Sequence, residues 1–68
     1  MINTVKVERA KRNITQAQLA EQVYVSRQTI NLIETGKFVP STLLALKIAK
    51  FFDTTVNELF KLEEKDVW

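Results

Sequence analysis

Residues 16–37 read QAQLAEQVYVSRQTINLIETGK, and this stretch decides the fold. It holds two short segments with apolar residues at helical spacing, separated by about three residues. The small Ala20 lies where two such helices would cross, and a small side chain lets their backbones approach closely. The stretch therefore predicts helices over 16–23 and 27–34, joined by a tight turn of the length used in helix-turn-helix units. The residues expected to face inward are Leu19, Ala20, Val23, Ile30 and Ile33.

Each helix in the chain is preceded by a residue that can cap its first turn. A Ser or Thr hydroxyl accepts a hydrogen bond from the free N–H groups there, and a Glu or Gln three residues later completes a capping box. The broad apolar stripe of residues 42–52, which includes Leu43 and Leu46, predicts that this is the central buried helix. The expected caps are Thr15 (with Gln18 as a box) before 16–23, Ser26 before 27–34, Ser41 before 42–52, and Thr55 (with Glu58 as a box) before 56–60.

The N-terminal segment fits two structures. Ile2, Val5 and Arg9 fit a helix from about residue 4 to residue 12, whereas the alternation at 5–7 fits a short strand paired with 60–62. Both alternatives stay open, and both give a compact all-α domain with at most a small sheet formed by the termini.

Length and composition exclude many classes of protein. The 68 residues make a single domain, and a chain this short buries only about 60% of its unfolded surface. It contains no Cys and no His, so disulfides, thiolate metal sites and His-dependent catalysis are excluded. We therefore expect a protein that is not an enzyme and has no catalytic residues, no metal and no cofactor. Oligomerisation is one remaining source of stability.

Charge is unevenly distributed along the chain. The net charge is +2, but residues 1–50 carry eight basic and three acidic residues, whereas 51–68 carry two basic and five acidic ones. This division favours a basic face for a polyanion and an acidic tail that lies elsewhere, although an ordinary solvated surface remains an alternative. No apolar run approaches the roughly 20 residues of a membrane span. We expect a cytoplasmic protein without membrane contact.

The outward face of helix 27–34 has the chemistry of base recognition. With Ile30 and Ile33 inward, a helical wheel turns Gln28, Asn31, Leu32 and Thr35 outward, with Arg27 at the flank. Arg can bind guanine, Gln and Asn can pair with adenine, and Leu can contact a thymine methyl group. A polar face without any ligand is the alternative interpretation.

Two blocks, Gln16–Val23 and Val25–Lys37, closely resemble the Cro/C1-type (XRE-like) helix-turn-helix regulators, and Pro40-Ser41 and Ala45–Lys50 match the next helix of that family. The resemblance covers about residues 4–62 and is strongest to the small stand-alone regulators of the cytolysin repressor type. It implies a five-helix, lambda-repressor-like DNA-binding domain that acts as a homodimer, in some members with a short sheet formed by the termini.

The resemblance also assigns roles to single residues. Two positions depart from the family: Tyr24 stands in the turn where Gly is usual, so the turn is expected to be either strained or differently shaped, because a non-Gly residue at positive φ is uncommon, and Glu8 stands where many relatives have an apolar residue. The implied base-contacting residues are Arg27, Gln28, Asn31 and Leu32; the backbone-contacting residues are Gln16, Ser26, Thr29, Lys37 and Ser41; and Arg9 and Glu34 form a structural ion pair.

These observations lead to one main functional hypothesis. The chain is expected to be a sequence-specific transcriptional regulator, a repressor that binds double-stranded DNA at a palindromic operator through residues 27–34. One recognition helix reads only a few base pairs, so a homodimer is expected, with Leu62, Val67 and Trp68 of segment 61–68, or the 42–60 region, at its interface. The alternatives are an antitoxin or accessory subunit that binds a partner protein through its acidic C-terminal tail, and a helical interaction module or RNA-binding protein.

Overall fold

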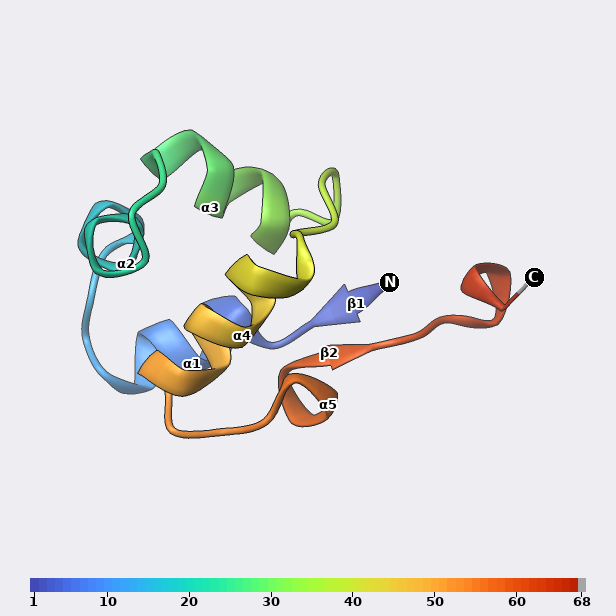
Figure 1. Cartoon of the computed structure of the whole chain (residues 1–68). Coiled ribbons are helices and arrows are strands. Elements are labelled where there is room, and N and C mark those ends of the chain that lie inside the picture. The colour runs from blue at the N-terminus through green and yellow to red at the C-terminus, as the bar shows by residue number, and fades with distance from the viewer. Residues whose placement is uncertain (68) are drawn as a thin grey trace.

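The computed structural model describes residues 1–67, in which short helices pack around one core and the strand near the N-terminus lies beside a strand from near the other end of the chain (Figure 1). Helices α2 and α3 form one layer, and α1, α4 and α5 complete the core beside a small antiparallel sheet. No helix in this part of the chain has the length and apolar character that a membrane span requires. The elements are β1 (Ile2–Asn3), α1 (Val5–Lys11), α2 (Gln16–Gln22), α3 (Arg27–Glu34), α4 (Thr42–Phe51), α5 (Val56–Leu59), β2 (Phe60–Lys61) and the 3-10 helix η1 (Glu64–Asp66).

The expected caps begin the helices. At Thr15 the capping box is complete, because its hydroxyl accepts from the Gln18 N–H and the Gln18 side chain accepts from the Thr15 N–H. The second box was wrong: Thr55 accepts from the Glu58 N–H, but among the hydrogen bonds of residues 1–67 the return bond from Glu58 is absent. The last helix also ends at Leu59, one residue earlier than expected, because Phe60 begins β2.

The core follows the predicted stripes of α2 and α3, which are confirmed. In α4, however, Leu43 and Leu46 are 64% and 54% exposed, so the expectation that the whole stripe is buried was wrong. A helix can press only one face against its neighbours, and α4 uses the other apolar residues for this. The buried apolar residues are Val5, Leu19, Ala20, Val23, Ile30, Ile33, Leu44, Ala45, Ile48, Ala49, Phe52, Leu59 and Phe60.

Both alternatives for the N-terminal segment are partly right. A helix is present from Val5, whose side chain is fully buried, and a terminal sheet is present as well. The strand, however, is residues 2–3 rather than 5–7: Ile2 pairs with Lys61 and Asn3 pairs with Phe60. The Asn3 side chain accepts the Val5 N–H at 3.1 Å, a local bond that favours a turn over an extended chain at the point where α1 begins.

Tyr24 lies in the turn between α2 and α3 and has a φ of 61°, so of the two alternatives the turn keeps the left-handed conformation and is strained. The other left-handed positions in residues 1–67 are Asn13, Gly36 and Asp53, all residue types that tolerate this conformation. The Tyr24 ring is 84% exposed, and the Lys47 ammonium lies 5.6 Å from its centre. Tyr24 is therefore the strained residue of the motif.

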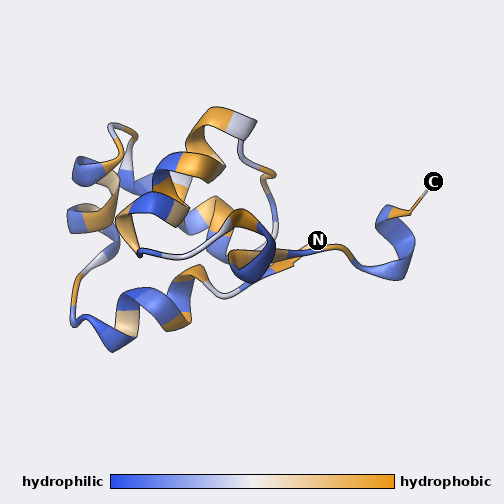
Figure 2. Ribbon diagram, turned by 60° about the horizontal axis from the view of Figure 1, so that its bottom comes forward, coloured by the Kyte–Doolittle hydropathy of each residue, from blue (hydrophilic) through white to orange (hydrophobic). Residues whose placement is uncertain are grey.

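The segment after β2 leaves the helical body as an arm that ends in η1 (Figures 1 and 2). In Figure 2 this arm carries mostly hydrophilic residues and extends away from the helices. Its described contacts with the body are made at the N-terminus, where the Met1 ammonium lies 2.8 Å from a Glu63 oxygen and 2.7 Å from an Asp66 oxygen.

Candidate nucleic-acid interface

The second helix of the motif, α3, has one face in the core and one in solvent. Ile30 and Ile33 are buried, and the exposed side chains are Arg27, Gln28, Asn31, Leu32 and Thr35. This division matches the helical wheel. The exposed set offers a guanidinium, two primary amides and one branched aliphatic group along about two turns. Between Arg27 and Asn31 it includes no acid, so it presents donors and neutral acceptors to a ligand.

Gln16, the first residue of α2, connects the two helices of the motif. Its amide nitrogen donates to the Asn31 side-chain oxygen at 3.2 Å, and its amide oxygen accepts from Arg27 Nη1, also at 3.2 Å. The same nitrogen also donates to Glu34 Oε1 at 3.0 Å. Two of the predicted base-contacting side chains are thus held by one half-buried glutamine. The sequence gives no signal for this arrangement, because it depends on how α2 crosses α3.

Glu34 and Arg9 form a two-point ion pair behind this face. Arg9 Nε donates to Glu34 Oε2 at 2.8 Å, and Arg9 Nη2 donates to Glu34 Oε1 at 3.1 Å. The side chains are 16% (Arg9) and 3% (Glu34) exposed, and Arg9 Nη1 also donates to the Ile14 carbonyl at 2.9 Å. The hydrogen bonds to Glu34 raise the pKa of Arg9 above its ordinary value. The pair fixes α1 to α3, and Glu34 in turn holds Gln16.

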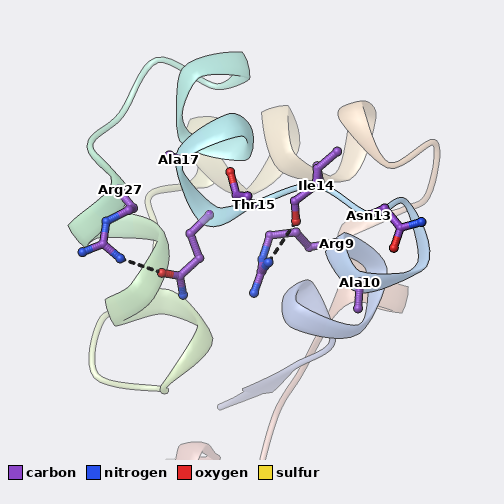
Figure 3. Close-up of a pocket in the computed structure, with 8 residues that line it drawn as sticks. Arg9, Ala10, Asn13, Ile14, Thr15, Ala17 and Arg27 are labelled. Carbon is purple, nitrogen blue, oxygen red and sulfur yellow. Dashed lines mark hydrogen bonds between the residues drawn. The ribbon is translucent and has the colours of Figure 1, made fainter.

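An open groove of 610 Å³ lies between the end of α1, the start of α2 and the start of α3. Figure 3 shows Arg27 on one side of this groove, Arg9 and Asn13 on the other, and Thr15 and Ala17 between them. Because Glu34 engages Arg9, the exposed Arg27 is the guanidinium available to an anion here.

The other expected backbone-contacting residues lie at helix starts or in the loop after α3. Ser26 and Thr29 share a hydroxyl contact of 2.9 Å at the start of α3, and the Ser26 hydroxyl also accepts from the Thr29 N–H. Ser41 caps α4. Lys37 is exposed in the loop, one residue after Gly36, whose φ of 76° turns the chain away from α3.

The residues predicted for a dimer interface are on the C-terminal arm. Leu62 is 70% and Val67 is 38% exposed, whereas Trp68 lies outside the described residues. On the body, an apolar groove of 340 Å³ lies next to the base of the arm and is lined by Val39, Leu46 and Val56, among others.

The N-terminal ammonium contacts two carboxylates of the arm. The hydrogen bond to Asp66 contributes most to raising the pKa of this ammonium, and the bond to Glu63 adds to it. The same contact lowers the pKa of Asp66.

Within residues 1–67 no three acidic side chains lie close enough together to hold a metal ion.

Comparison with known proteins identifies the motif. The helix-turn-helix family model matches residues 5–59. An uncharacterised helix-turn-helix-type transcriptional regulator of Methanocaldococcus jannaschii is 48% identical over 66 residues, which are 97% of this chain and 100% of that protein. YgzD, an uncharacterised regulator of the same type from Bacillus subtilis, has the same identity, aligned length and coverage of both chains. The transcriptional activator BcrR of Enterococcus faecalis is 48% identical over 56 residues, which are 82% of this chain and 28% of BcrR.

Proposed function

The chain belongs to the helix-turn-helix family of DNA-binding transcriptional regulators, and we propose that it is a repressor that binds a palindromic operator as a homodimer through α3. The observation that carries this proposal is the exposed face of α3, whose amides, guanidinium and leucine match the groups on base edges in the major groove.

Base reading is assigned to Arg27, Gln28, Asn31 and Leu32. In this proposal Arg27 donates to guanine, Gln28 and Asn31 each pair with adenine, and Leu32 contacts a thymine methyl group. Gln16 supports the reading because it holds both Arg27 and Asn31 by hydrogen bonds of 3.2 Å before any DNA is bound. Side chains that are already oriented lose less conformational freedom when they bind.

Backbone binding is assigned to residues around this face. Lys37 supplies an exposed cation beyond the end of α3, and Gln16 lies beside Arg27 in the groove of 610 Å³, a place that suits a phosphate. The hydroxyls at the starts of α3 and α4 are the remaining groups. The assigned backbone-contacting residues are Gln16, Ser26, Thr29, Lys37 and Ser41.

A homodimer follows from the small number of contacts that one α3 can make. Each good base contact is worth about 1–3 kcal/mol, so one α3 gives little preference over the many non-specific sites of a genome. We assign the dimer interface to the exposed Leu62 and Val67 of the arm, to Trp68, and to the groove lined by Val39, Leu46 and Val56. The exposed apolar side chains of the arm of one copy can pack in the apolar groove of the other copy across a two-fold axis.

We propose repression because a protein that is bound over a promoter blocks other proteins from that DNA and needs no additional interaction surface to do so. BcrR is named an activator, and the region that it shares with this chain is 28% of BcrR. Reporter expression from the chain's own operator, with and without the protein, distinguishes the two directions: repression lowers expression and activation raises it.

The DNA assignment is tested with two matched alanine variants, measured on a selected operator and on a scrambled duplex. Gln28→Ala should lose about 1–3 kcal/mol on the operator and little on the scrambled duplex, whereas Lys37→Ala should weaken both equally. The affinity of the wild-type protein should also fall steeply as salt rises, because phosphate contacts release counterions. Equal losses for both variants on both duplexes would refute the assignment of roles. Affinity that does not change with salt would favour an interaction module or an accessory subunit that binds a partner through its acidic tail.

A further inference from the structure

Asn3, in the two-residue strand β1, uses both atoms of its side-chain amide. The oxygen accepts from the Val5 N–H at 3.1 Å, which starts α1, and the nitrogen donates to the Ile33 carbonyl at 2.9 Å, in the last turn of α3. Its backbone is paired with Phe60 of β2. One half-buried residue therefore connects the terminal sheet, the start of α1 and the end of α3. We propose that Asn3 is a positioning residue that sets the orientation of α3 relative to the terminal sheet, an inference that rests on the proposed reading of DNA by α3.

The bond from Asn3 is not needed to cap α3. The Ile33 carbonyl already accepts from the Gly36 N–H at 3.0 Å, so one of its two lone pairs is used within the local chain. What Asn3 adds is a connection between residues that are 30 positions apart in sequence. Because the Asn3–Ile33 bond is not needed for capping and joins distant parts of the chain, its effect is to fix the position of α3.

A second connection lies at the next residue of α3, where Glu34 binds Arg9 of α1. Asn3 binds a backbone carbonyl at the C-terminal end of α3, whereas Arg9 binds the Glu34 side chain, so the two connections together restrain both the tilt of α3 and its rotation about its axis. Arg9 supplies the connection to α1, and Asn3 supplies the connection to the sheet.

Arg27 and Gln28 lie in the first turn of α3, at the end opposite Ile33, so these two of the four base-reading residues are the most sensitive to this placement. Arg27 is six residues before Ile33, or about 9 Å along the axis at a rise of about 1.5 Å per residue. A tilt of about 10° about the C-terminal end therefore moves the start of α3 at Arg27 by about 1.5 Å, which is larger than the tolerance of about 0.5 Å within which a recognition site must be held.

The sheet is also the base of the C-terminal arm, because β2 ends at Lys61 and the exposed Leu62 follows. The β1–β2 pair and Asn3 therefore give one route by which the docking of a second copy of this chain on the arm would act on α3. The orientation of α3 and the assembly of the dimer are thus connected by one side chain.

The test replaces Asn3 without removing the start of α1. Asn3→Asp keeps the size of the side chain and the acceptor for the Val5 N–H, but it turns an oxygen toward the Ile33 carbonyl. Asn3→Ser keeps a short acceptor, cannot reach Ile33, and adds no charge. The control is Asn57→Asp, the same chemical change at an exposed position in α5. Circular dichroism confirms that each variant is folded before binding is measured.

Two readouts are compared. The first is the ratio of affinities for the selected operator and a scrambled duplex, which should fall about tenfold in both Asn3 variants, the equivalent of about one base contact, and stay within about twofold in Asn57→Asp. The second needs no DNA: the backbone amide shifts of residues 27–31 in the free protein should change in both Asn3 variants and not in the control.

The outcomes separate this inference from the proposed function. Unchanged amide shifts, or an unchanged affinity ratio in variants that are merely less stable, would overturn the role of Asn3. A wild-type protein that does not discriminate between the two duplexes would overturn the proposed function, and the amide shifts would still decide whether Asn3 positions α3.

Discussion

Replacing Arg9 with Met removes the positive charge of the Arg9–Glu34 pair and keeps most of the aliphatic side chain. It leaves the Glu34 carboxylate, which is 3% exposed, with the Gln16 amide as its remaining side-chain donor, and it leaves the Ile14 carbonyl without its Arg9 donor. Breaking a buried ion pair from one side costs about 3–5 kcal/mol, because a buried charge remains without compensation. A domain of this length has a total stability of only about 3–10 kcal/mol. Arg9→Met should therefore lose a third or more of the free energy of unfolding.

Glu34→Met should cost less, about 2 kcal/mol, because Arg9 is 16% exposed, keeps its bond to Ile14 and can turn toward water. In the double variant two apolar side chains of similar length meet, and no buried charge is left. Its loss should be at least about 2 kcal/mol smaller than the sum of the two single losses, since apolar replacement of a buried pair is often close to neutral.

The assay is urea unfolding followed by far-UV circular dichroism at about 15 °C, near the temperature where small domains are most stable. Lys11→Met is the control, because its pair with Glu8 is exposed and should leave the urea midpoint almost unchanged. A loss below about 1 kcal/mol for Arg9→Met, or single losses that add to the double loss within about 0.5 kcal/mol, would refute the structural role of the pair.

Three further predictions concern the core, the turn between α2 and α3, and the loss of stability at low pH. Ile33→Ala should destabilise the fold by about 2–5 kcal/mol, and a melting experiment that shows a loss below about 1 kcal/mol would contradict its place in the core. Tyr24→Asn should raise the melting temperature, because a left-handed backbone costs a residue such as Tyr about 1 kcal/mol; a lower melting temperature would mean that the contact with Lys47 outweighs the strain. Hydrogen bonds from Lys11 and then Arg12 lower the pKa of Glu8, so its contribution is present above the ordinary carboxyl value of 4.5 and is lost as pH falls through the folded pKa. Glu8→Gln should therefore flatten the decrease of the urea midpoint between pH 6 and pH 3, and an unchanged slope would contradict this.

Much of the fold could be predicted from local signals. The start of each helix from α2 to α5 is marked by a Ser or Thr whose hydroxyl accepts a hydrogen bond from a first-turn N–H. The position of this one residue was therefore enough to predict where each of these helices begins. At Tyr24 the sequence indicated an unusual turn but left two shapes open, and the positive φ decides between them. The inward and outward faces of α3 followed from the spacing of Ile30 and Ile33.

The parts that could not be predicted depend on long-range geometry. Leu43 and Leu46 have the same hydropathy as Leu44, and only the packing of α4 decides which of the three is buried. The terminal strand was displaced from residues 5–7 to 2–3 because Asn3 binds the Val5 N–H, a contact that no periodicity reveals.

The same limit applies to the candidate site. A pattern of residue types indicated which side chains of α3 face outward, but the bonds from Gln16 to Arg27 and Asn31 arise only when α2 crosses α3. The roles of the individual residues toward DNA, and the surface that joins two copies, therefore stay proposals that follow from chemistry and exposure.

The most direct test of the proposed function is a selection of bound duplexes from a random pool by the intact chain. We expect enrichment of one inverted repeat whose half-site centres are about 34–36 Å apart, which is about one turn of DNA, because two α3 helices related by a two-fold axis enter successive major grooves. A bound pool that remains as random as the starting pool would contradict sequence-specific recognition by α3.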